Sequence, residues 1–120
     1  MLFRSNLKSP TTVIGKTVTY AVTTSLAAAL TNAASSGKAF KVNSVYCANV
    51  DGTAAADISL ALNDGTTDRY LAKTIAVPAD ATQVLVTREG YIYVEEGQSL
   101  KAVASAADDL ELVISYEDIS

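Results

Sequence analysis

The chain has 120 residues, 49% of them hydrophobic, and its nine Lys and Arg against thirteen Asp and Glu give a net charge of −4. This is the size of one ordinary domain, which can bury a core without disulfides or metals. One cysteine and no histidine exclude an intrachain disulfide, a Cys/His zinc site and any catalytic pair that contains histidine.

The charges are unevenly distributed along the sequence. The first 50 residues hold five cationic side chains and no acid, whereas residues 89–120 hold eight acids and a single lysine. Surfaces of opposite sign steer and align partners, so this division favours a role in assembly. The cations are few and dispersed and the isoelectric point is about 4.6, which argues against nucleic-acid binding.

Residues 1–10 lie outside the strand pattern that follows. They contain no apolar run typical of a signal peptide, and the Ala/Leu-rich residues 26–30 are too few to cross a bilayer, so we expect no membrane association. The segment is either a frayed terminus or an N-terminal arm that lies on a neighbouring subunit. In the second case the assembly contacts are its apolar and cationic side chains: Leu2, Phe3, Arg4, Leu7 and Lys8.

Most of residues 11–120, which we expect to form a single domain, show the period-two alternation of β-strands. In the segment ADISLALN, for example, Ala56, Ile58, Leu60 and Leu62 share one face. Residues 25–34 could form a helix, but the Thr-rich flanks favour a strand or a turn. Turn signals about ten residues apart indicate an antiparallel all-β sandwich or barrel of about eight strands. The expected strands are 12–22, 40–50, 56–63, 69–77, 83–87, 91–94, 99–105 and 110–117.

Four aspartates near turns are candidate calcium ligands, since Ca²⁺ prefers oxygen donors. Asp51, Asp57, Asp64 and Asp68 lack the spacing of an EF-hand, and aspartates in turns need no metal to explain them. We therefore expect no metal and no cofactor.

Two further candidates concern catalysis and sugar binding. Glu89, Glu95 and Glu96 could supply a pair of carboxylates for glycoside hydrolysis, and together with Tyr91 and Tyr93 they could form a carbohydrate-binding edge. Solvated turn ends and packed tyrosines explain these residues better than either function.

In the segment VYCANV, apolar residues occupy both alternating sets of positions. This pattern predicts a strand covered on both faces or a β-bulge around Cys47. No activating group lies near this cysteine in the sequence, so we expect a buried thiol and no enzyme activity.

The segments ANVDG (48–52), YLAKTIAVPA (70–79), YVEEGQSLKA (93–102) and SYEDIS (115–120), with the lead-in 22–42, resemble small β-sandwich virion proteins of tailed bacteriophages. The resemblance covers about four-fifths of the chain. It implies a jelly-roll-like fold, a homotrimer, and a location in the virion after assembly in the host cytoplasm.

The resemblance also implies a function. We expect a non-enzymatic capsid cement or decoration protein whose partners are copies of itself and the major capsid protein. Two alternatives remain open. One is a neck, collar, baseplate or fibre-attachment component of the tail, and the other is a host-surface carbohydrate-binding module.

Overall fold

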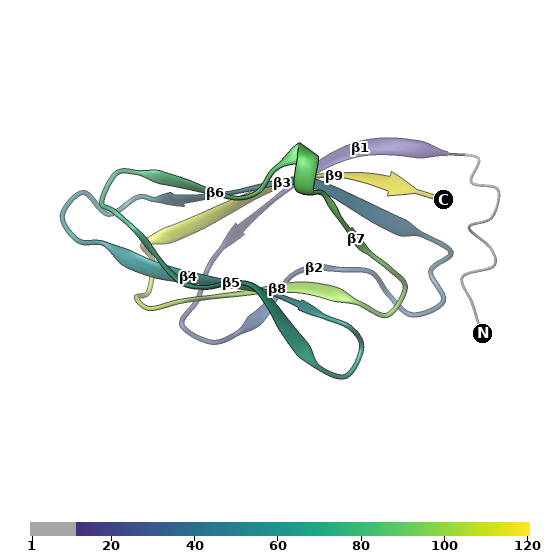
Figure 1. Ribbon diagram of the computed structural model, residues 1–120, viewed down its shortest axis with the longest axis horizontal. Helices are drawn as coiled ribbons and strands as arrows, with labels where there is room; N and C mark the ends of the chain where they lie inside the picture. The colour runs from purple at the N-terminus through teal and green to yellow at the C-terminus, as the bar shows by residue number, and fades with distance from the viewer. Residues whose placement is uncertain (1–11) are drawn as a thin grey trace.

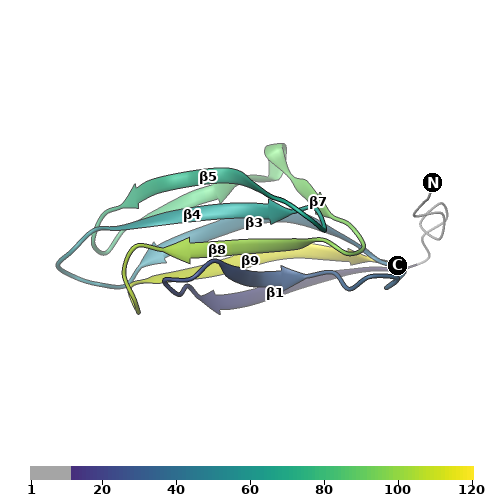
Figure 2. The same ribbon diagram turned by 90° about the horizontal axis from the view of Figure 1, so that it is seen from below.

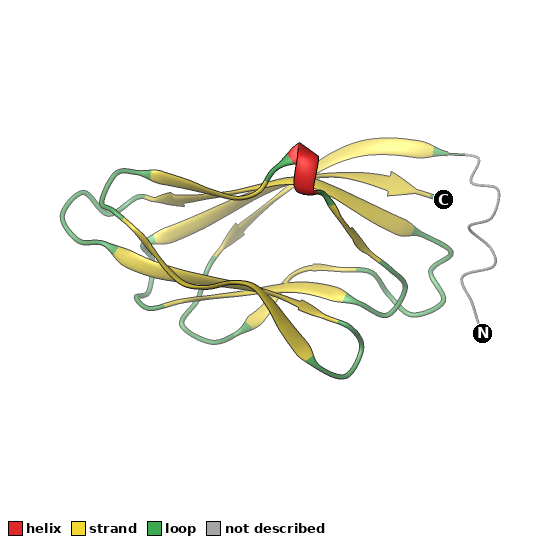
Figure 3. Cartoon of the chain, in the orientation of Figure 1, coloured by secondary structure: helices red, strands yellow, loops and turns green. Residues whose placement is uncertain are grey.

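Residues 12–120 are described by the computed structural model, and they form nine β-strands and one short 3₁₀ helix (Figures 1 and 3). Every paired strand is antiparallel, so the expected antiparallel β-sandwich is confirmed. The elements are β1 (Val13–Ala21), β2 (Ala27–Thr31), β3 (Ala39–Asn49), β4 (Ala56–Asn63), β5 (Asp68–Val77), β6 (Thr82–Val86), η2 (Arg88–Gly90), β7 (Ile92–Val94), β8 (Ser99–Ala104) and β9 (Leu110–Ile119).

The strands form two sheets that face each other. One has the order β1-β9-β3-β6, with β7 also paired to β3, and the other has the order β2-β8-β4-β5 (Figures 1 and 2). β6 and β7 pair with different stretches of β3, on either side of η2, and so share one strand position. The result is eight strand positions in two four-stranded sheets with the first and last strands adjacent, which is a jelly roll.

The core lies between the sheets and is built from alternate residues of the strands. β9 shows this most plainly, since Leu110, Leu112 and Ile114 are fully buried while Val113 faces outward. The same alternation places Ile58 and Leu60 of β4 in the core. The buried apolar side chains form one continuous cluster, because each inner face needs the other to exclude water.

Residues 27–31 form strand β2, as the Thr-rich flanks of this segment predict. β2 pairs with β8, and Leu30 points into the core. The Ala/Leu composition favours a helix locally, but the strand conformation satisfies the free edge of β8 and buries Leu30. Among residues 12–120, no helix is long and apolar enough to cross a membrane.

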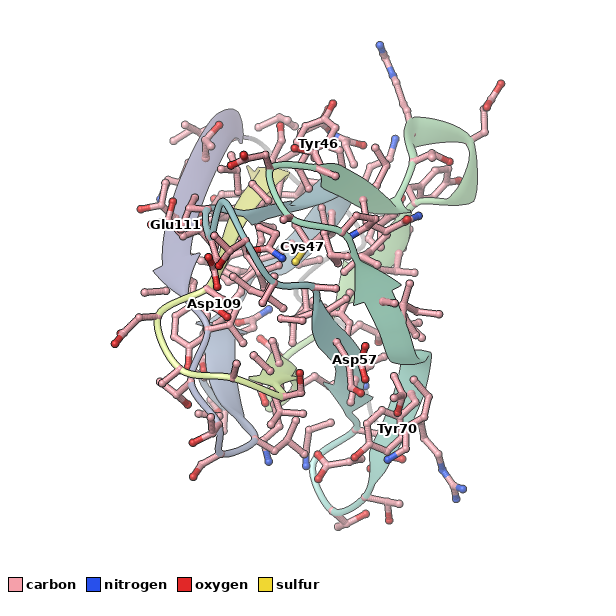
Figure 4. All side chains as sticks on the ribbon, turned by 90° about the vertical axis from the view of Figure 1, so that its left-hand side faces the viewer. Tyr46, Cys47, Asp57, Tyr70, Asp109 and Glu111 are labelled. Carbon is pink, nitrogen blue, oxygen red and sulfur yellow. The ribbon has the colours of Figure 1, made fainter. Side chains whose placement is uncertain are left out.

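The irregular pattern around Cys47 reflects a β-bulge, the second of the two predicted alternatives. The register of β3 shifts between Val42 and Ser44 against β9, and again between Val45 and Tyr46 against β6. Val42, Val45 and Cys47 can therefore all face the core while Tyr46 faces outward. Figure 4 shows Cys47 between the two sheets and Tyr46 on the outer side.

Two buried asparagines join the sheets, one at each end of the sandwich. Asn32, which follows β2, donates through Nδ2 to the carbonyls of Lys38 and Val94 at 2.8 and 3.0 Å. Asn49, the last residue of β3, donates to the carbonyls of Ala54 and Val77 at 3.0 and 2.9 Å. Buried carbonyls that lack a donor are costly, so these amides hold both loop ends in place.

Substitution of the fully buried Leu112 by Ala should destabilise the fold by about 2–5 kcal/mol, since it removes three buried carbons and leaves a cavity between the sheets. The neighbouring Val113→Ala, on the outer face of the same strand, is the matched control and should change stability by less than about 1 kcal/mol. Urea unfolding followed by circular dichroism measures both. Equal losses for the two variants would contradict the assigned inner and outer faces of β9.

Candidate interaction surfaces

The proposed arm contacts Leu2, Phe3, Arg4, Leu7 and Lys8 lie outside the described residues. The chain enters the described part at Thr12, whose backbone forms two hydrogen bonds with Ser120, each 2.9 Å long. Residues 1–11 therefore precede a fixed point at the end of the sandwich where β9 also ends (Figure 1).

Part of the basic first half of the chain pairs directly with the acidic last strand. Lys16 Nζ and Lys38 Nζ lie 3.0 and 3.2 Å from Oδ2 of Asp118, a side chain that is almost fully buried. β1 and β3 both pair with β9, which brings these distant parts of the sequence together. Some of the charge asymmetry in the sequence is thus neutralised within the chain itself.

The two lysines determine the protonation of Asp118. Burial alone raises the pKa of this carboxyl, but hydrogen bonds from Lys16 and Lys38, together with their charges, outweigh burial and lower the pKa below its ordinary value. The hydrogen bond to Asp118 is also the main reason why the pKa of Lys16 is raised. The ionised carboxylate is consequently the form that the folded state stabilises.

Asp118→Asn should lower the free energy of unfolding at neutral pH by about 1–2 kcal/mol, since the lysine side chains remain 43% and 41% exposed and water screens them. The stabilisation by wild-type Asp118 is present above the unfolded pKa of about 3.9 and is lost as pH falls through the lower folded value. Urea titrations from pH 2 to 7 measure it, with Glu111→Gln on the same strand as control. A variant as stable as the wild type at pH 7 would show that the cluster contributes nothing.

Acidic side chains gather at the end of the sandwich opposite Thr12 and Ser120. The loops 50–55, 78–81 and 105–109 meet there, joined by hydrogen bonds such as Asp80 N–H to the carbonyl of Asp51 at 3.2 Å. The described residues contain all thirteen acids and seven of the nine cations of the chain. This acidic end has six of those acids and none of those cations, so it carries the whole negative excess of residues 12–120: Asp51, Asp57, Asp80, Asp108, Asp109 and Glu111.

A row of exposed apolar side chains crosses the outer face of the sheet β1-β9-β3-β6. Tyr46 of β3 lies opposite Val113 of β9 and Val84 of β6, and the three are 44%, 39% and 41% exposed. Glu111 lies one position further along the same face, opposite Ala48. In Figure 4, Tyr46, Asp109 and Glu111 lie on the side of this sheet, whereas Asp57 and Tyr70 lie on the other side.

A shallow groove of about 490 Å³ adjoins this row, where η2 interrupts the strand position beside β3. It runs from Tyr46 and Val84 to Arg88 and Glu117. Asn43 donates to Glu117 at 3.3 Å within it. The groove offers aromatic, cationic and anionic contacts within one open surface.

Tyr91 and Tyr93, the predicted sugar-binding edge, are brought together by the structure. Their rings meet edge to face with centroids 5.7 Å apart, and both rings are exposed. Lys41 Nζ lies 4.3 Å from the Tyr91 ring centroid in a cation–π contact. The exposed rings could stack against another molecule.

A second apolar surface lies on β5 at the edge of the other sheet. Tyr70, Leu71 and Ile75 are exposed there. Lys73 Nζ lies 4.4 Å from the centre of the Tyr70 ring, and Arg69 is adjacent in the strand. This surface is therefore apolar and cationic.

The four candidate calcium ligands, Asp51, Asp57, Asp64 and Asp68, do not converge. Asp51 lies at the acidic end, whereas Asp64 and Asp68 lie beside the β4–β5 turn at the opposite end. Among residues 12–120 there is no group of three or more side chains suited to hold a metal ion.

Asp51, Asp64 and Asp68 each have a local structural role. The pKa of Asp51 is lowered chiefly by the backbone N–H of Thr53, and the pKa of Asp64 chiefly by the backbone N–H of Thr67. The amide of Asn63 is the main cause of the lowered pKa of Asp68, which also pairs with Lys101 at 3.3 Å. Asp51 and Asp64 thus order their own turns.

Cys47 lies in the core, and burial raises the pKa of its thiol to about 11. The reactive thiolate is therefore scarce near neutral pH. The side chain packs as a small apolar group among Val42, Val45 and the other core residues.

No protein-family model matches this chain, and no curated protein matches it.

The sequence had indicated Tyr91 and Tyr93. It did not reveal the acidic end or the row through Tyr46, because both are assembled from strands far apart in the chain. The only signal for the row was the apolar residue at an outward position of β9.

Proposed function

We propose that this protein is a non-enzymatic structural component of a tailed-phage virion, specifically a cement or decoration protein that bridges neighbouring major capsid subunits. The observation that carries this proposal is the jelly roll with exposed apolar side chains on its outer sheet faces. Jelly rolls occur in viral capsid domains as well as in lectins. The resemblance of about four-fifths of the sequence to virion β-sandwich proteins favours the first of these.

The proposed mechanism is mechanical. A rigid sandwich, assembled as a homotrimer, binds only the assembled capsid lattice and adds buried interface that resists internal pressure. Binding that favours the assembled state stabilises it by mass action, about 2.7 kcal/mol per site at a free concentration one hundred times the dissociation constant. The fully buried apolar cluster supplies the rigidity for this role.

Deletion of residues 1–10 should weaken binding to phage heads by at least about tenfold, since this proposal assigns Leu2, Phe3, Arg4, Leu7 and Lys8 to assembly contacts. Heads that lack the protein are mixed with purified chain, sedimented, and assayed for bound copies and for resistance to heat. Thermal unfolding of the truncated chain is the control, and it should match the full chain because β1 begins at Val13. Unchanged binding by the truncated chain would exclude the arm from attachment.

Copy number distinguishes a head position from a tail position. Quantitative mass spectrometry of the particle should find hundreds of copies for a lattice decoration. A small multiple of three or six would instead place the protein at the neck, collar, baseplate or fibre attachment.

A second candidate function, recognition of a host-surface carbohydrate, is favoured by the exposed Tyr91–Tyr93 pair. Aromatic rings stack on the apolar faces of sugar rings, so Tyr91→Ala with Tyr93→Ala should abolish any glycan-array signal of the full chain. Tyr70→Ala, an exposed tyrosine of the other sheet, serves as the control. Absence of glycan binding by the full chain would eliminate this candidate.

A further inference from the structure

One outer face of the sandwich combines exposed apolar side chains with uncompensated negative charge. The apolar row of Tyr46, Val84 and Val113 lies beside Glu111, and the backbone N–H of the exposed Val50 bonds to the carbonyl of Asp109 at 2.7 Å. We name this surface the acidic face; it comprises Tyr46, Val50, Val84, Val113, Asp109 and Glu111. Figure 4 shows Tyr46 and Glu111 on the outer side of this sheet and Asp109 at the end of the sandwich, beside the start of β9.

The segment of this chain that complements the acidic face is residues 1–10. It contains three large apolar side chains, two cations and no acid, in the interleaved order LFRSNLK from residue 2 to residue 8. The acidic face offers the reverse on the side of Glu111, where aliphatic and aromatic side chains lie beside carboxylates. Arg88 lies on its other side, in the groove that adjoins Tyr46 and Val84. Charge complementarity of this kind selects and orients partners.

The other exposed apolar surface, on β5, is a poor match for the same segment. There Leu71 and Tyr70 lie beside Arg69 and Lys73, so a cationic segment would meet charges of its own sign. Like charges that face each other in an interface weaken binding. Of these two surfaces, the acidic face suits residues 1–10 better.

Residues 1–10 join the sandwich at Thr12, and the position of Thr12 favours binding of this segment to the acidic face of another subunit. Thr12 is hydrogen-bonded to Ser120 at the end of the sandwich remote from the acidic face. Glu111 lies level with Ala21, eight residues beyond Val13, while Lys8 precedes Val13 by only five residues. At about 3.3–3.6 Å per residue, the backbone of Lys8 falls short of Glu111 in the same subunit, and Arg4 reaches it only if the chain reverses and runs back along the whole of β1.

We infer that residues 1–10 of one copy bind the acidic face of a second copy. Leu2, Phe3 and Leu7 cover the apolar row, and Arg4 and Lys8 pair with Glu111 and the neighbouring acids. The donated segment and the receiving face are different parts of the chain, so the contact is heterologous and either closes into a ring or extends as a filament. This inference rests on the proposed assembly role only for the expectation that copies associate, and it requires no contact with a capsid.

The test uses purified full chain in sedimentation velocity and light scattering over a concentration series. We expect discrete oligomers or longer assemblies that dissociate on dilution. Deletion of residues 1–10, the pair Arg4→Glu and Lys8→Glu, or Tyr46→Lys should each raise the dissociation constant at least about tenfold. Leu71→Lys is the matched control, because Leu71 is 43% exposed on the other sheet, and it should leave association unchanged.

Charge reversal on both partners is the decisive experiment. Glu111→Lys alone should weaken association, and Glu111→Lys combined with Arg4→Glu and Lys8→Glu should recover most of the loss, since the pairs re-form with exchanged signs. Circular dichroism and thermal unfolding check that each variant is folded. A full chain that stays monomeric to roughly 100 µM overturns the inference, as does association that persists after deletion of residues 1–10 or after Tyr46→Lys.

These results are independent of phage heads. A chain that associates through the acidic face but does not bind heads contradicts the proposed function and leaves the inference standing. A chain that binds heads as a monomer supports attachment to the capsid but contradicts both the proposed homotrimer and the inference.

Discussion

The structure depends on the mutual burial of two inner sheet faces. Neither four-stranded sheet can keep its apolar face from water alone, and most of the core side chains are no larger than Val, Leu or Ile, so the faces must fit closely over their whole length. The buried amides of Asn32 and Asn49 then satisfy loop carbonyls at the two ends, where the strands no longer pair. Since the interior is filled in this way, any function must lie on the outer faces and ends.

The two ends of the long axis of the sandwich differ in net charge. At the end that holds both Thr12 and Ser120, the carboxylate of Asp118 is neutralised by Lys16 and Lys38. The opposite end has acids without cations among the described residues. A subunit with one balanced end and one acidic end can associate with direction, because complementary charge is offered on one side only. That polarity supports the inference that copies of this chain associate in a fixed orientation.

Much of the fold was predictable from local pattern. The eight expected strands correspond to β1 and β3 to β9 with boundary differences of at most two residues, because period-two alternation and Gly turns are local signals. β2 was harder, since its Ala/Leu composition favours a helix and only pairing with β8 makes it a strand. The order of strands could not be derived from pattern, and the jelly roll was an expectation drawn from resemblance. The candidate surfaces were still harder to predict from the sequence, since Tyr46, Val84 and Val113 come from three different strands.

The sequence by itself determined the strands, the buried character of Cys47 and the uneven placement of charge along the chain. Only the tertiary structure decided which charges are neutralised. Lys16 and Lys38 lie 102 and 80 residues from Asp118 in sequence, yet both bond to it because β1 and β3 flank β9. Coulomb energy depends on separation in space and on burial, and neither is encoded in sequence distance. The apparent division into a basic and an acidic half is therefore, in the folded chain, a division between two ends of one sandwich.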